Sequence, residues 1–476
     1  MGNGTIELAG LDGGPVAVPD KDVAVLAEGL DGAVLHRGDA GWDDAVRIWN
    51  GMVARVPGLV VRPAGAADVV AAVRFAADRG LLLSVKGGGH NIAGTSMAPG
   101  GLTLDMALMR DVDVDAAARL VHVGPGCILR DVDARTQEHG LAAVLGFVSE
   151  TGVAGLTLGG GFGYLTRRYG WTVDTLEAVE IVTAEGRVLT ADRDHEPELF
   201  WALRGGGGNY GVVTRFTFRL FDVGPTVTGG MIVWPGGRAA EVLRAYRDLT
   251  ESAPRHLTAV CAVRLAPPAP FLPPEWHGKP IVAMILCHTG ADAAADLAPV
   301  RAIGDPVADL VTEKPYAAQQ QMLDATQPKG LHYYWKTEFV PGLPDAFLDA
   351  LRAGGEAVTS PMSQAILFHL AGALNERAED DGAVGNRDAA YVTGFAGCWP
   401  PGDPRADEHV AWARGSWEAI RPFSTGGNYV NFQVADDDAG RTEAAYGANF
   451  DRLRAVKARY DPGNLFRVNR NIAPPG

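Results

Sequence analysis

The stretch Ser84-Val-Lys-Gly-Gly-Gly-His-Asn-Ile-Ala-Gly-Thr-Ser96 joins a glycine loop to a single histidine. Three glycines, Gly87 to Gly89, let the backbone enter positive φ and press its N–H groups against a flat or anionic group. His90 follows at once, and an imidazole held at the end of such a loop could attach a cofactor. A tight surface turn with an incidental histidine is the alternative. The stretch predicts a phosphate-binding loop or a cofactor attachment site, provided that other motifs agree.

Glycine clusters again at Gly159–Gly163, Gly205–Gly211 and Gly426–Gly427. The run from 148 to 170 is so rich in glycine that we expect an irregular backbone forming the wall of a site. Gly206-x-Gly208-x-x-Gly211 has dinucleotide-binding spacing, but a helix is expected before it and a strand after it. A Rossmann loop needs the reverse order, which disfavours a nicotinamide-dependent dehydrogenase.

The first half of the chain must position these loops. Short apolar runs alternate with helical periodicity, which indicates an α+β sheet layered with helices. We expect strands at 58–62, 81–85, 102–105, 120–123 and 213–220, a hairpin at 180–190, and helices at 42–50, 66–79, 129–139 and 199–204.

Beyond Pro225 the strands lengthen, and the pattern indicates a second α+β domain: a sheet with one face covered by helices and the other free to roof a pocket. Expected strands are 258–264, 281–287, 332–340, 365–370, 391–399 and 428–434, with helices at 239–252 and 443–459.

Composition narrows the class of partner. The 476 residues suggest two domains, and a net charge of −15 argues against nucleic acid or an anionic membrane, so we expect a small-molecule ligand. The N-terminus has no signal-peptide pattern and no apolar run could span a bilayer, which makes a cytoplasmic location the expectation. The four cysteines are widely spaced, and Cys127 is interpreted as a buried thiol. No metal is expected.

Several distant motifs together resemble the berberine-bridge-enzyme-like flavin oxidases of the vanillyl-alcohol-oxidase superfamily, which have a PCMH-type FAD-binding fold. They are Lys86-Gly-Gly-Gly-His90, Gly159-Gly-Gly-Phe-Gly163 with Arg168-Tyr-Gly170, Leu199-Phe-Trp-Ala-Leu-Arg-Gly-Gly-Gly-Gly-Asn-Tyr-Gly211, Tyr429-Val-Asn431, and Pro462-Gly-Asn-Leu-Phe466 with Asn469 and Asn471. The resemblance implies a two-domain α+β fold. Residues 1–225 (core about 53–223) would bind FAD, 226–428 would bind substrate, and 429–476 would return to the FAD-binding domain.

The resemblance also implies that His90 bonds to the methyl group on the benzenoid edge of the flavin. Many members add a second link from a cysteine, but Val148 stands at that position here, so a single histidyl link is expected. The FAD-binding positions implied are Lys86, Gly87, Gly88, Gly89, His90, Asn91, Thr151, Gly155, Thr157, Gly159, Gly160, Gly161, Gly163, Tyr164, Val213, Tyr429, Asn469 and Asn471.

For the catalytic base, Tyr429 matches a tyrosine that many members place beside the substrate carbon. A phenol of pKa about 10 needs a cation or a hydrogen bond to act near neutrality. Lys336 and Glu338 lie two apart on an expected strand and so share a face. If that face lines the pocket, Lys336 could lower the phenol pKa or Glu338 could bind an amine; a solvated ion pair is the alternative. Arg387 is given no catalytic role.

The implied activity is an oxidase that takes a hydride from a C–OH or C–N carbon and reduces O2 to H2O2. Two alternatives stay open: a flavin dehydrogenase with another acceptor, and a non-catalytic protein that binds FAD or another ligand. The substrate, whether sugar, secondary alcohol, natural product or cyclic amine, and the oligomeric state are not fixed by the sequence.

Overall fold

The computed structural model describes residues 4–475. A small mixed sheet, in which only β3 is antiparallel to its neighbour, organises the N-terminal end. The strand order is β3-β4-β6-β5, in which β6 runs parallel to both β4 and β5. The bounds are β3 Ala33–Leu35, β4 Leu59–Arg62, β5 Leu83–Lys86 and β6 Leu102–Asp105, with α3 Ala66–Asp78 between β4 and β5. Because α3 buries Val69 and Val73 in the same core as the strands, the layer is rigid where β5 leads into the His90 loop.

A second, antiparallel sheet has the order β11-β10-β12-β8-β7. Its strands are β7 Val112–Asp115, β8 Leu120–Val123, β10 Leu176–Val182, β11 Val188–Asp192 and β12 Val212–Arg219. The helices of this region are α4 Leu129–Thr136, α5 Val153–Leu158, α6 Thr166–Tyr169 and α7 Pro197–Leu203. The expectation of an irregular backbone over 148–170 is therefore wrong in part, since α5 and α6 lie inside it.

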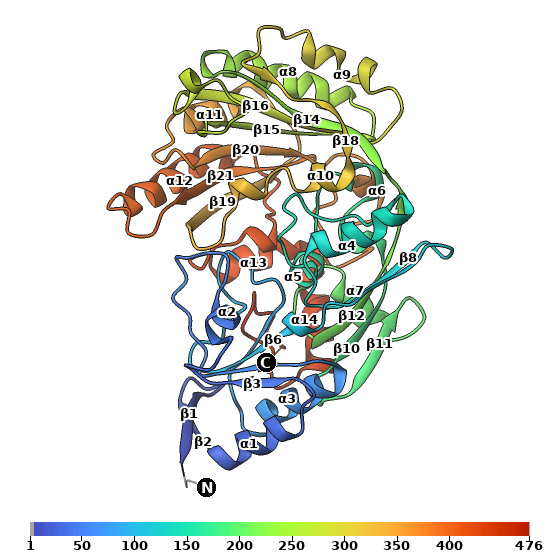
Figure 1. Ribbon diagram of the computed structural model, residues 1–476, viewed down its shortest axis with the longest axis vertical. Coiled ribbons are helices and arrows are strands. Elements are labelled where there is room, and N and C mark those ends of the chain that lie inside the picture. Colours follow the sequence, from blue (N-terminus) through green and yellow to red (C-terminus); the bar gives the residue numbers. More distant parts are fainter. Residues whose placement is uncertain (1–3, 476) are drawn as a thin grey trace.

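An eight-stranded antiparallel sheet forms the upper half of the molecule in Figure 1. Its order is β17-β14-β16-β15-β20-β21-β19, with β18 also paired to β14. The bounds are β14 Thr226–Pro235, β15 Leu257–Leu265, β16 Pro280–His288, β17 Ala308–Asp309, β18 Thr312–Pro315, β19 His332–Val340, β20 Gln364–His369 and β21 Tyr391–Trp399.

Helices cover one face of this large sheet. They are α8 Ala239–Ser252, α9 Ala293–Arg301, α11 Asp345–Glu356 and α12 Ala406–Ile420, while α10 Tyr316–Gln320 lies at the β14 edge. Along β15, Cys261 and Val263 pack into the core shared with α8, α11 and α12, whereas Ala262 and Arg264 face the other way. One face is thus covered by helices and the other faces the N-terminal half, as predicted.

The C-terminal segment returns to the N-terminal half through α13 Ala439–Tyr446 and α14 Phe450–Tyr460. Lys457 and Asp461 form a buried ion pair of 2.6 Å, and the Lys457 ammonium also donates to the Asn209 carbonyl. Leu465 and Phe466 then enter the core that holds β4 and β6. Residues more than 350 positions apart in sequence therefore build one layer.

Two expectations for the C-terminal region are wrong. The expected strand at 428–434 is a 3-10 turn, Val430–Phe432, and the expected helix at 443–459 is interrupted at Gly447, where φ is +50°. The N-terminal hairpin, β1 Thr5–Ala9 with β2 Pro15–Pro19, and helix α1 Asp20–Glu28 were not predicted. Within residues 4–475, no helix has the length and apolar character needed to cross a bilayer.

Candidate active site

A cavity of about 380 Å³ lies between the helix-free face of the large sheet and the glycine loops of the N-terminal half. Its volume falls within the range of about 300–1,000 Å³ that is usual for small-molecule sites. The loops around His90, Gly155 and Gly208 line one half, together with the C-terminal residues Asn469 and Arg470. The N-terminal half, the large sheet and the C-terminal segment therefore contribute to one shared cavity.

Glycines leave parts of the cavity wall without side chains. Around Gly155 and Gly208, no atom lies within 4 Å of where a Cβ would stand, so the bare backbone opens directly into the cavity. A Cβ on Gly88 would lie 2.5 Å from the Gly152 Cα, so only glycine permits these two loops to meet. Gly89 has φ +68°, the left-handed region predicted for the loop. The arrangement fits a long, flat ligand held against the backbone.

His90 ends the glycine loop and lines the same cavity. Its ring stacks on Trp49, with centroids 4.4 Å apart, and its Nε2 is buried without a hydrogen-bond partner among residues 4–475. Burial, reinforced by the nearby Lys329, lowers the pKa of His90 to about 3. The imidazole is therefore neutral at pH 7 and keeps a lone pair, which is the state that a nucleophilic nitrogen requires. The contact with Trp49 was not predicted from the sequence.

Several other implied FAD positions also line the cavity: Gly87, Gly88, Gly89, Asn91, Thr151, Gly155, Gly159, Val213, Tyr429 and Asn469. Others do not line it: Lys86, Thr157, Gly160, Gly161, Gly163, Tyr164 and Asn471. Lys86 is buried, donating 2.8 Å to the Ala45 carbonyl and pairing with Asp105 at 3.3 Å. A Cβ on Gly163 would lie 1.8 Å from the Leu145 carbonyl oxygen, so that glycine is needed for backbone packing.

The position expected for a second flavin link is a valine on the cavity wall. Val148 and its neighbour Phe147 both line the cavity. Cys127 lies outside the lining, is fully buried, and its thiol donates to the Asp111 carbonyl at 3.6 Å. Burial raises the pKa of Cys127 to about 12, which keeps it a thiol. Val148 cannot form the link, and Cys127 is a packing residue.

Tyr429 projects into the cavity from the start of the 3-10 turn. Its phenol oxygen accepts hydrogen bonds from the Gly161 N–H at 3.1 Å and the Asn431 amide at 3.0 Å. The strand expected here is wrong, yet Asn431 does lie beside Tyr429. Burial raises the pKa of Tyr429 to about 12, although both donors favour the phenolate. Since the oxygen already accepts twice, its own hydrogen is left for a group in the cavity.

The expectation that Lys336 and Glu338 face the pocket is wrong. On β19, Trp335 and Thr337 line the cavity, and Lys336 and Glu338 point to the opposite face, under α12 and α13. Neither forms a solvated pair, because their exposed fractions are 5% and 3%.

Each of the two charges is balanced on that buried face. The Lys336 ammonium donates to Asp437 at 2.6 Å. Glu338 accepts from Arg441 and from the Trp417 indole at 2.6 and 2.7 Å. Neither residue can lower the pKa of Tyr429 by contact or bind a substrate amine.

We expect Glu338→Gln to lower stability without slowing the chemistry. Removing one partner of a buried ion pair costs ~3–5 kcal/mol, and here Arg441 would lose its 2.6 Å carboxylate partner and keep only the longer 3.5 Å contact with Asp437. The free energy of unfolding from denaturant titration should fall by that order, while the rate of flavin reduction below the unfolding transition stays within about twofold of wild type. Glu313→Gln, the same change on the exposed strand β18, is the control and should alter neither quantity. Slow flavin reduction with unchanged stability would contradict this placement.

Arg387 has the structural role expected. It makes a bidentate, buried ion pair with Asp174, at 2.7 and 2.8 Å, and so ties the second half of the chain to the loop after α6. It does not line the cavity.

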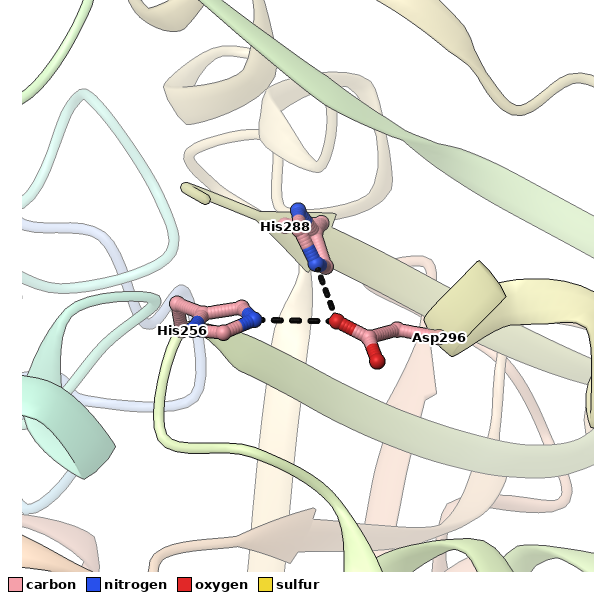
Figure 2. A group of neighbouring side chains, drawn as sticks. All are labelled: His256, His288 and Asp296. Atoms are coloured by element: carbon pink, nitrogen blue, oxygen red, sulfur yellow. Dashed lines mark hydrogen bonds and ion pairs between the residues drawn. The ribbon is translucent and has the colours of Figure 1, made fainter. Parts of the chain in front are cut away.

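One group among the described residues, drawn in Figure 2, could hold a metal ion by its donor types. None of its three residues lines the cavity. His256 and His288 both bond to the same Asp296 oxygen through Nε2, at 2.9 and 2.8 Å. The Gly290 N–H donates to His288 Nδ1, so the proton of the neutral ring is on Nε2, where a metal would have to bind. The cluster is best described as a hydrogen-bonded link between α9 and the sheet. The expectation that no metal is required stays a prediction.

Comparison with known proteins agrees with this architecture. Residues 57–192 match the family "FAD binding domain", and residues 428–473 match "Berberine and berberine like". An FAD-linked oxidoreductase of Dictyostelium discoideum is 32% identical over 94% of this chain and 96% of its own. The (R)-6-hydroxynicotine oxidase of Paenarthrobacter nicotinovorans is 30% identical over 94% and 98%.

Solved structures have the same fold. The 6-hydroxy-D-nicotine oxidase of Arthrobacter nicotinovorans superposes with a TM-score of 0.84 at 29% identity, covering 94% of this chain and 98% of that one. The xylooligosaccharide oxidase of Myceliophthora thermophila also has a TM-score of 0.84, at 22% identity over 95% and 99%, and it bears on the fold alone. With these matches over nearly its whole length, the chain belongs to the berberine-bridge-enzyme-like family of FAD-linked oxidoreductases.

Proposed function

We propose that this enzyme is an FAD-dependent oxidase that removes a hydride from a carbon bearing a hydroxyl or amine and reduces O2 to H2O2. The observation that carries the proposal is the single cavity in which His90, the bare glycine backbone and Tyr429 meet. The oxidases among the relatives support the choice of oxygen as acceptor. When bound, FAD supplies the redox chemistry by accepting the hydride and passing two electrons to the acceptor.

The chain's own residues would hold the cofactor and orient the reaction. Gly87 to Gly89 and Gly155 offer backbone to the long ligand, and His90 is placed to form a single covalent link. The glucooligosaccharide oxidase of Acremonium strictum is described as carrying a 6-S-cysteinyl, 8α-N1-histidyl FAD, which supports a histidyl link in this fold. Val148 supports the absence of the cysteinyl one. Tyr429 would take the proton from the substrate hydroxyl or amine.

Each proposed domain is formed by defined segments of the chain. Residues 1–225 with the return at 429–476 would form the FAD-binding domain, and 226–428 the substrate domain. The family matches at 57–192 and 428–473, with the large sheet between Thr226 and Trp399, support these boundaries.

Substrate screening in the absence of oxygen tests the proposal. We expect at least one compound among sugars, secondary alcohols, cyclic amines and aromatic natural products to bleach the flavin absorbance, because hydride transfer needs no acceptor. Admitting air should restore the absorbance and release one H2O2 per substrate. Bleaching that air does not reverse would indicate a dehydrogenase with another acceptor. No bleaching by any compound would favour the non-catalytic alternative.

A further inference from the structure

The half of the cavity formed by the large sheet contains one cation and no acid. Arg264 lies near the end of β15 on the helix-free face and lines the cavity. Among the lining residues within 4–475 there is neither an aspartate nor a glutamate. The cavity therefore has a positive local charge, although the whole chain carries a net charge of −15.

Arg264 has only uncharged protein partners. Its Nη1 donates to the Gln364 side-chain oxygen at 3.1 Å, and its Nε donates to the Leu265 carbonyl at 3.1 Å. In the described part of the chain, Nη2 has no acceptor and the guanidinium has no ion pair. Burial lowers the pKa of Arg264, yet arginine stays protonated in proteins. The side chain is only partly buried and lines the cavity, so an anion bound there could supply the counterion that the protein does not.

The surroundings of Arg264 indicate what else such a ligand must have. The neighbouring lining side chains on this face include Met231, Val233, Ala283 and Ile366, with Phe271 from the loop after β15. An oligosaccharide would leave its many hydroxyl groups without partners on this apolar surface. A protonated amine would meet a cation and find no carboxylate. An apolar, flat molecule with one anionic end fits both features.

Sheet register places the cation far from Tyr429. Arg264 pairs with Gln364 on β20, and Phe368 lies four residues further along that strand, roughly 13 Å away at the usual rise per residue. Phe368 contacts Phe162, whose ring lies 4.9 Å from that of Tyr429. A ligand that reaches both ends must therefore be elongated, with its anionic group on the order of 10 Å from the reacting carbon.

We propose that the enzyme binds elongated apolar substrates that end in a carboxylate, and that Arg264 pairs with this carboxylate at the sheet end of the cavity while the reacting carbon lies near Tyr429. This inference rests on the proposed function and narrows its substrate class, away from cationic amines and oligosaccharides. An arginine fork matches a carboxylate in a bidentate geometry that Gln364 helps to hold.

Binding to the holoenzyme tests the assignment without turnover. Isothermal titration at pH 7 would compare 4-phenylbutanoate, 4-phenylbutanamide and 4-phenylbutylamine, which share a skeleton and differ in terminal charge. We expect the carboxylate to bind about 10- to 100-fold more tightly than the amide, the range of a hydrogen bond to a charged group, and the amine to bind most weakly. Equal affinities, a preference for the amine, or no binding by any probe would overturn the proposal.

Substitution of Arg264 assigns the preference to its side chain. Arg264→Met should reduce the carboxylate-to-amide ratio to within about twofold, and Arg264→Lys should retain part of it because the charge remains and the fork is lost. Arg264→Gln provides a polar variant if the Met variant does not fold. Arg215→Met, which removes an exposed arginine from β12, should keep the wild-type ratio. A carboxylate preference that survives Arg264→Met would overturn the assignment. Flavin bleaching is scored separately, so failure here leaves the oxidase proposal standing.

Discussion

Replacing His90 with alanine is expected to remove all covalently attached flavin. Wild-type protein on a denaturing gel should fluoresce yellow-green in acid, and the His90→Ala band should be dark. The reason is the state of the imidazole: its burial holds the pKa at about 3, its Nε2 has no partner among the described residues, and Trp49 fixes the ring against the cavity. No other histidine lines the cavity, so within residues 4–475 no second imidazole could replace it.

Two controls separate attachment from folding. The exposed His139 ends the turn after α4, and His139→Ala should fluoresce like wild type. The His90→Ala protein should still bind FAD reversibly, since the glycine backbone around Gly155 is unchanged. If acid precipitation released all the flavin from wild-type protein, the covalent link would be disproved.

The number of links is tested by mapping the flavin-bearing peptides. We expect a single fluorescent peptide, containing His90, because Val148 cannot react and the Cys127 thiol is buried outside the cavity. Flavin on a second peptide would mean that Val148 does not mark the position of the second link.

The sequence predicted elements best where local periodicity and burial agree. Helix α8 has the expected bounds, 239–252, because Val242, Leu243, Tyr246 and Leu249 form one apolar stripe that packs on the sheet. The glycine loop at His90 could be predicted because consecutive glycines are visible in the sequence and let the backbone lie close to a ligand. These signals are local, so a single sequence contains them.

The sequence could not show which face of strand β19 lines the cavity. Alternation placed Lys336 and Glu338 together, but both faces of β19 are buried: one lines the cavity through Trp335, and the other lies under α12 and α13. Because Lys336 and Glu338 are charged, they were placed on the face of β19 that opens to the pocket. Their partners, Arg441 and Asp437, are about a hundred residues away in sequence and left no local sign.

The strand predicted at 428–434 is wrong for a related reason. Its alternating pattern resembles a strand, yet side-chain amides take the place of sheet pairing. Asn428 donates to the Arg441 carbonyl, and Gln433 donates to both Asn428 and Arg441. This network of tertiary hydrogen bonds stabilises the turn that carries Tyr429. Asparagine and glutamine also occur in strands, so their presence did not distinguish a turn from a strand.

Tyr429→Phe is expected to slow flavin reduction by about 10²–10⁴-fold, the usual loss for a positioned base, with covalent flavin retained. The phenylalanine would keep the ring against Phe162 and Phe432, and only the oxygen that accepts from Gly161 and Asn431 would be lost. Stopped-flow mixing with an active substrate under nitrogen measures this rate directly. Tyr316→Phe, which alters a buried phenol outside the cavity lining, should reduce at the wild-type rate.

The pH dependence distinguishes a base from a simple hydrogen-bond donor. Burial raises the phenol pKa to about 12, so between pH 6 and 10 the phenolate fraction grows about tenfold per pH unit. If the phenolate takes the substrate proton, the reduction rate should rise with that slope in wild type and be flat in Tyr429→Phe. With Lys336 on the far face of β19, only the neutral donors Gly161 and Asn431 stabilise the phenolate. Asn431→Ala should therefore raise the phenol pKa further and lower the rate at each pH, while keeping the slope. A rate that is independent of pH in wild type, together with near wild-type reduction by Tyr429→Phe, would remove the tyrosine from proton transfer.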